Sequence, residues 1–87
     1  MPRQIIGTGQ ITITSDATQV IPENLSRAGI MITNTDTNNS VYIGNEDVLA
    51  DTGEVLFPEE SITIPVTNAV YAITDGPDIL VTYMEIQ

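Results

Sequence analysis

Alternating β-branched residues are the feature that most restricts how this chain can fold. Residues 10–14 read Gln-Ile-Thr-Ile-Thr, and the same alternation of apolar and polar positions returns at 30–33, 41–43 and 61–66. A period of two places the apolar side chains on one face of a strand, whereas no window has the apolar spacing of a helix of adequate length. The pattern therefore predicts a protein built from half-buried strands.

Turn-forming residues separate these runs at spacings of roughly ten residues, as in sandwiches and barrels. Pro22-Glu23-Asn24, Pro58-Glu59-Glu60 and Asp75-Gly76-Pro77-Asp78 are examples. Pro65 indicates an edge strand or a bulge, because proline cannot donate to a ladder. We expect an all-β, jelly-roll-like antiparallel sandwich of about eight short strands. Its predicted core is Ile11, Ile13, Ile30, Ile32, Ile43, Ile62, Ile64, Val66, Ile73 and Val81.

A chain of 87 residues is expected to form one domain. Residues 9–87 make up the predicted sandwich, and residues 1–8, which show no clear pairing pattern, are expected to form an N-terminal arm. Ile5 and Ile6 are too apolar to prefer water. We therefore expect the arm to lie on a neighbouring subunit or another partner, where Arg3 would meet a carboxylate.

The charge of the chain argues against two classes of partner. Twelve Asp and Glu residues oppose two arginines, for a net charge of −10. Such a chain repels phosphate backbones and anionic membranes, so we expect neither nucleic acid nor a membrane as a partner. No apolar run approaches the ~20 residues of a membrane span, and the first ten residues lack a signal-peptide core. Without Cys or His, self-association or docking on a partner is the support left for a small core.

Asp51-Thr52-Gly53 matches the triplet of aspartic proteases, in which two carboxylates share one proton. Both arginines precede the triplet and little chain follows it, so the late apolar-Gly-Arg motif of the retroviral-type enzymes is missing. We interpret the triplet as a turn in which Asp51 bonds its own backbone and Gly53 supplies a positive φ. Nucleophile–base pairs reduce to carboxylates and hydroxyls in this chain, so we expect no enzyme and no cofactor.

Asn34, Asp36 and Asn38 place oxygen-bearing side chains at alternate positions, like the start of a calcium loop. An EF-hand would need Gly and Glu where Asn39 and Asn45 stand, which favours a plain loop. A weak calcium site at this loop stays open, and we expect no other metal site.

Arg27 stands at the entry to the strand expected at residues 29–33. The favoured reading is local: the guanidinium would hold a loop by binding carbonyls or a carboxylate. The alternative is contact with a neighbouring subunit, which makes Arg27 a candidate interface residue together with Arg3, Ile5 and Ile6.

Four motifs carry a family resemblance. They are Asn24-x-Ser26-Arg27, Ile30-Met31-Ile32-x-Asn34, Val41-Tyr42-Ile43-Gly44 and Gly53-x-x-Leu56-x-Pro58-x-Glu60, followed by Tyr71-Ala72 and a final apolar strand. Together they resemble small β-sandwich virion proteins of tailed bacteriophages, most of all capsid decoration (cement) proteins. The chain departs from the pattern at Glu59, where these proteins commonly have glycine.

The resemblance implies a structural virion protein, made in the host cytoplasm, that binds the major capsid protein on the outer surface of a phage head and stabilises it. It also implies a homo-oligomer, most often a trimer. The alternative is a tail-fibre or baseplate module that binds a host glycan or another tail protein. Only four aromatic residues and no Trp weigh modestly against glycan binding.

Overall fold

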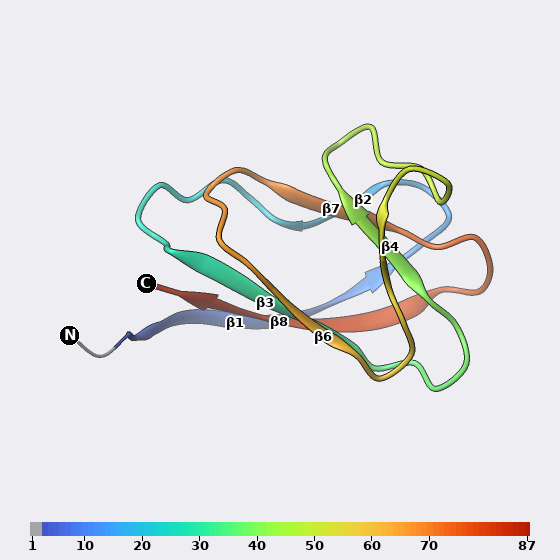
Figure 1. Cartoon of the computed structure of the whole chain (residues 1–87), viewed down its shortest axis with the longest axis horizontal. Coiled ribbons are helices and arrows are strands. Elements are labelled where there is room, and N and C mark those ends of the chain that lie inside the picture. The colour runs from blue at the N-terminus through green and yellow to red at the C-terminus, as the bar shows by residue number, and fades with distance from the viewer. Residues whose placement is uncertain (1–2) are drawn as a thin grey trace.

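The computed structural model describes residues 3–87, and the regular elements of this part are all strands (Figure 1). They are β1 (Ile5–Ile13), β2 (Thr18–Ile21), β3 (Gly29–Asn34), β4 (Val41–Gly44), β5 (Glu54–Leu56), β6 (Ser61–Ile64), β7 (Val70–Ile73) and β8 (Ile79–Ile86). Over these residues there is no helix of the length and apolarity that a membrane crossing requires. The predicted all-β class is confirmed.

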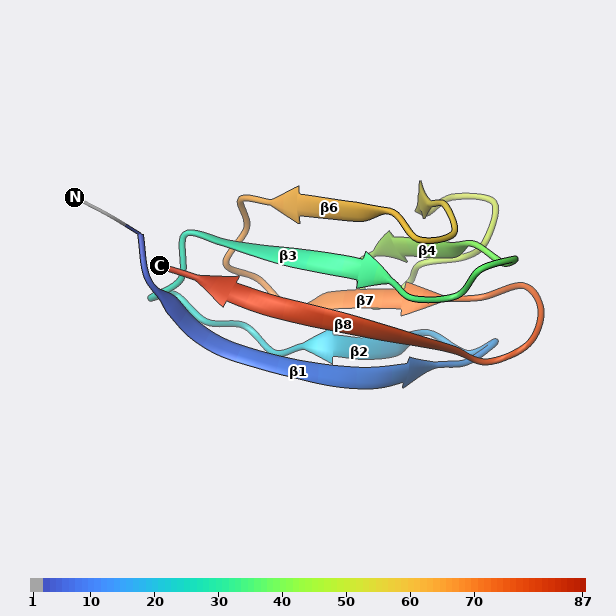
Figure 2. The same ribbon diagram turned by 90° about the horizontal axis from the view of Figure 1, so that it is seen from below.

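The strands form two antiparallel sheets of four, with the orders β1-β8-β3-β6 and β2-β7-β4-β5. We call these the first and the second sheet. Figure 2 looks onto the first sheet, with β2, β7 and β4 of the second sheet behind it. Consecutive strands lie in opposite sheets except β4 and β5, which pair within the second sheet, and this is the strand order of a jelly roll. The predicted jelly-roll-like sandwich is confirmed.

The edge position of β6 confirms the interpretation of Pro65. β6 is the last strand of the first sheet and ends at Ile64, directly before the proline. The ladder with β3 therefore stops where the chain loses its amide donor.

The N-terminal arm is shorter than the sequence predicts. Residues 5–8 belong to β1, where Thr8 pairs with Met84 and Ile5 pairs with Ile86. The alternation in residues 1–8 is obscured because the register shifts between Ile5 and Gly7. Only residues 1–4 precede the sheet, and the first two lie outside the described residues. Deleting residues 1–8 would thus remove part of an edge strand together with Gln4, whose carbonyl accepts the Gln87 amide at 2.9 Å.

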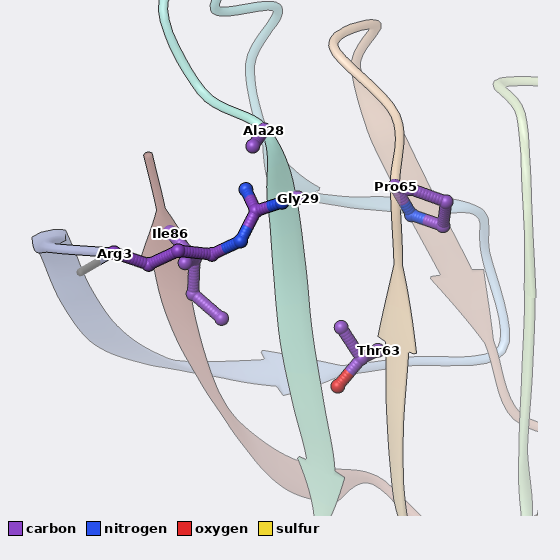
Figure 3. A pocket seen from close by; sticks show the side chains of 6 residues that line it. All are labelled: Arg3, Ala28, Gly29, Thr63, Pro65 and Ile86. Carbon is purple, nitrogen blue, oxygen red and sulfur yellow. The ribbon is translucent and has the colours of Figure 1, made fainter. Parts of the chain in front are cut away.

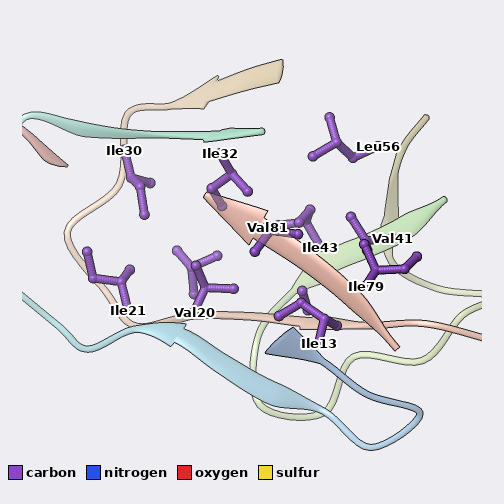
Figure 4. Close-up of a cluster of buried hydrophobic side chains, with 12 residues drawn as sticks. Ile13, Val20, Ile21, Ile30, Ile32, Val41, Ile43, Leu56, Ile79 and Val81 are labelled. Carbon is purple, nitrogen blue, oxygen red and sulfur yellow. The ribbon is translucent and has the colours of Figure 1, made fainter. Parts of the chain in front are cut away.

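The core lies between the two sheets and is formed by aliphatic side chains from all eight strands (Figure 4). Six predicted core residues are buried: Ile13, Ile30, Ile32, Ile43, Ile73 and Val81. The other four, Ile11, Ile62, Ile64 and Val66, are partly buried and pack against the cluster. The prediction missed Val20, Ile21, Val41, Leu56, Val70, Ala72 and Ile79, which complete it.

The loop between β4 and β5 covers part of the outer face of the second sheet. Val48 in this loop is buried without belonging to the core cluster. A Cβ placed on Gly44 would lie 2.8 Å from Val48 Cγ2, so the loop packs directly on β4. Ile73 is also buried outside the core cluster, and its register partner is Tyr42 on that same outer face. The predicted core residue Ile73 thus belongs to this second, smaller layer.

Candidate functional site

The Asp51-Thr52-Gly53 triplet forms a tight turn, as interpreted from the sequence. The amides of Thr52 and Gly53 donate to the carbonyl of Leu49 at 3.1 and 2.8 Å, and the Leu49 amide donates to Thr52 Oγ1 at 3.1 Å. The hydroxyl of Thr52 thus does what we expected of Asp51, whose exposed carboxylate accepts no hydrogen bond from residues 3–87. The triplet is a structural turn in this chain.

The expected positive φ at Gly53 is wrong. No described glycine has a positive φ, and the glycine is required instead for close packing. A Cβ at Gly53 would lie 2.8 Å from both Tyr42 Cβ and Val48 Cγ2, and 3.1 Å from the Tyr42 carbonyl carbon. The one positive φ among non-glycine residues described is 61° at Glu59. This is the position at which the family pattern commonly has glycine.

The Asn34 loop uses its polar atoms to hold itself together. Asn34 is fully buried; its Nδ2 donates to the carbonyls of Asn39 and Leu56 at 2.9 and 3.1 Å, and its Oδ1 accepts the Asp36 amide at 2.9 Å. The Asp36 carboxylate accepts the amides of Asn38 and Asn39 at 2.9 and 2.6 Å. These bonds hold the pKa of Asp36 below its ordinary value. The arrangement is that of a plain Asx loop.

Arg27 is enclosed by its own chain. Its side chain is 0% exposed; Nε donates to the Val66 carbonyl and Nη1 to the Pro22 carbonyl, both at 2.9 Å. Nη2 donates to the carbonyl of Asn68, and Nη1 lies 3.2 Å from Glu85 Oε1. Arg27 therefore has the local role favoured from the sequence, in which the guanidinium holds loops by binding carbonyls and a carboxylate. The alternative, an exposed contact with a neighbouring subunit, is wrong because the guanidinium does not reach the surface.

Arg3, Ile5 and Ile6 lie at the end of the first sheet where β1 begins. Ile5 and Ile6 are 61% and 40% exposed. Arg3 folds back over a shallow hollow of about 220 Å³, and its Nη1 donates to the Gln87 carbonyl at 3.4 Å (Figure 3). The hollow is otherwise lined by Ala28, Gly29, Thr63, Pro65 and Ile86. These three predicted interface residues are thus exposed and near one another along the chain.

Two of the other hollows group residues that the sequence alone does not bring together. One, of about 300 Å³, lies beside the edge strand β6 and is lined mainly by apolar side chains of Ile43, Ile62, Ile64, Val66 and Val70. The other, of about 230 Å³, groups Tyr71 with Asn45, Glu46, Asn68 and Ala69. Both combine residues far apart in the sequence, so only the tertiary fold reveals them.

Among residues 3–87 no three acidic side chains converge so as to hold a metal ion. In comparisons with known proteins, no family model, curated protein or solved structure matches the chain.

Proposed function

We propose that this protein is a capsid decoration protein that binds the major capsid protein on the outside of a phage head. The proposal rests on the family resemblance in the sequence, and the jelly-roll strand order is compatible with it. A decoration protein acts by binding the capsid, so its function depends on a stably folded binding surface.

The observation that carries the proposal is where the resemblance motifs fall in the fold. Arg27 and Asn34, both in the motifs, are buried polar residues that hold loops through hydrogen bonds. Gly44 and Gly53 lie where a Cβ would collide with Val48. Glu59, the departure from the pattern, adopts the backbone conformation that glycine favours. The motifs thus act together as a folding signature, which supports kinship with the small virion sandwiches.

Copy number tests the proposal. Quantitative mass spectrometry of purified virions should give a copy number close to that of the major capsid protein or a simple fraction of it, since decoration follows shell symmetry. Particles made without the protein should release their genome at a lower temperature, and adding the purified chain should restore the wild-type temperature. A copy number matching the tail, with unchanged heads, would contradict the proposal.

The hollow at Tyr71 favours a second candidate, a tail module that binds a glycan. A partly exposed aromatic ring beside amide and carboxylate groups can stack on a sugar and bind its hydroxyls. A glycan array with Tyr71→Ala as the control variant separates the two functions. Binding lost in this variant would favour the tail module.

A further inference from the structure

The outer face of the first sheet carries two complete rows of uncharged side chains. The registers align Thr8, Met84, Met31 and Thr63 across β1, β8, β3 and β6, and then Gln10, Thr82, Thr33 and Ser61. Residues directly opposite in antiparallel strands point to the same face. The pair Thr12 and Leu80 extends the face at one end, and Ile86 extends it at the other. We call this set the uncharged face.

This face is unusual because the chain is so acidic. Ten of the twelve Asp and Glu residues lie in the loops between strands. Of the two in strands, Glu54 belongs to the second sheet and Glu85 turns inward to Arg27. The strands of the first sheet thus carry no charged residue in their outward rows, although the net charge of the chain is −10.

The two sheets differ in how their outer faces are covered. The β4–β5 loop packs on the second sheet through Val48 and brings Glu46, Asp47 and Asp51 to that side. No described segment covers the first sheet in this way: Leu80 is 42% exposed, and Met31 and Met84 are only partly buried. The molecule therefore has one acidic, covered side and one open side whose strands carry no charge on their outer face, with Arg3 lying beside Thr63 and Ile86 at one end of it.

The open side is chemically suited to burial. Met31 and Met84 are register partners at its centre, and methionine fills irregular contacts well because it is flexible and polarizable. The surrounding threonines add methyl groups, and Thr33 and Ser61 already bond each other at 2.6 Å. Packing on the two rows would bury no charged strand residue in an interface, and Arg3 lies at one end of the face.

We infer that the uncharged face is the surface through which one copy of this chain binds another. Two molecules of like charge repel one another, and this side lets them meet while their carboxylates stay apart. A basic partner would instead be drawn to the acidic loops. The strand dimensions give a contact of about 500 Å² per copy, near the lower limit for specific association. The pairing is accordingly weak and reversible.

This inference concerns the self-association expected from the sequence and does not depend on binding to a shell. It concerns the isolated chain in solution, whereas the decoration role is measured on virions. Either result can fail without the other.

Two matched glutamines provide the test. Gln10 and Gln19 are both exposed strand residues, but Gln10 lies on the uncharged face and Gln19 lies opposite Tyr71 on the outside of the second sheet. Sedimentation equilibrium of the full chain up to about 1 mM should show reversible association of the wild type. Gln10→Glu should weaken it about tenfold or more, and Gln19→Glu should change it little.

Lysine variants separate a buried contact from general repulsion. If Gln10 lies in the interface, Gln10→Lys should weaken association as Gln10→Glu does, although it lowers the net negative charge. If only long-range repulsion acts, Gln10→Lys should tighten association as much as Gln19→Lys. Thermal melting of each variant checks that the fold is intact.

A direct signal comes from the methionines. The ¹³C-methyl resonances of Met31 and Met84 should shift with protein concentration in the wild type and stay fixed in Gln10→Glu. A chain that remains monomeric at about 1 mM, or an oligomer equally insensitive to changes at Gln10 and Gln19, would overturn the inference.

Discussion

Arg27 Nη1 lies 3.2 Å from Glu85 Oε1 inside the sandwich, and the three guanidinium nitrogens together donate to three backbone carbonyls. Asn24 Nδ2 donates to the same Glu85 oxygen at 3.2 Å. One side chain therefore ties the β2–β3 and β6–β7 loops to the last strand. It is the only ion pair among the residues described.

Replacing Arg27 should destabilise the fold strongly. Arg27→Ala leaves a largely buried carboxylate and three carbonyls without their donor, which should cost about 3–5 kcal/mol. Urea denaturation of wild type and variant measures the loss. Arg3→Ala, which removes the exposed arginine, is the matched control and should leave the urea midpoint unchanged. A small effect of Arg27→Ala would mean that water replaces the guanidinium.

Glu59→Gly should stabilise the protein. A side chain at a φ of 61° costs roughly 1–2 kcal/mol, of which part is offset by the greater entropy of glycine in the unfolded chain. We expect a net gain of up to about 1 kcal/mol. Glu59→Ala is the control, because it removes the same charge and keeps the Cβ. An equal gain from Glu59→Ala would assign the effect to charge.

The fold class could be predicted because the longer strands alternate apolar and polar residues over enough positions to be recognised as strands from the sequence. Ile11 to Ile13, Ile30 to Ile32 and Ile62 to Ile64 show which side faces inward without any knowledge of their partners. The short strands are too brief to show which of their sides faces inward. β5 has three residues, so Leu56 gives no pattern although it is 1% exposed. Their core residues are defined only by the sheet they join.

Site features were harder to predict because they depend on contacts across the chain. The role of Arg27 could be ranked from the sequence, but its carbonyl partners come from loops that only the fold brings together. Asp51-Thr52-Gly53 was correctly interpreted as a turn, but partly for the wrong reason. Glycine is needed at position 53 because Tyr42 and Val48 pack closely against it, and not because the backbone there has a positive φ. Such steric demands leave no local signal.

Gly53→Ala should destabilise the sandwich. The new Cβ would lie 2.8 Å from Tyr42 Cβ, which belongs to a strand and cannot move freely, and we expect a cost of about 1–3 kcal/mol. Gly76→Ala is the matched control, because nothing lies within 4 Å of its Cβ position. Chemical denaturation should separate the two variants clearly. Similar behaviour of both would show that the β4–β5 loop yields to the extra methyl group.

Asp51→Asn tests the same stretch for chemistry. Because the Asp51 carboxylate is exposed and accepts no hydrogen bond from the described residues, the variant should keep wild-type stability and self-association. A peptidase assay on the wild type should show no cleavage. Cleavage that Asp51→Asn abolishes would make the triplet catalytic after all.

The contribution of Asp36 to stability should depend on pH in a defined direction. Amide donors from Asn38 and Asn39 lower the pKa of this carboxyl in the folded state below the 3.8 of an unperturbed group. A group with a lowered folded pKa stabilises the protein fully above its unfolded pKa, and this contribution is lost as the pH falls through the folded pKa. Asp36→Asn removes the charge and keeps an acceptor oxygen, so it should be less stable than wild type at pH 7. The two urea midpoints should converge as the pH falls through the folded pKa of Asp36, which lies below 3.8, because the wild-type carboxyl then becomes neutral as well. Midpoints that differ by the same amount from pH 7 to about pH 2 would show that the shape of the side chain, and not its charge, holds the loop.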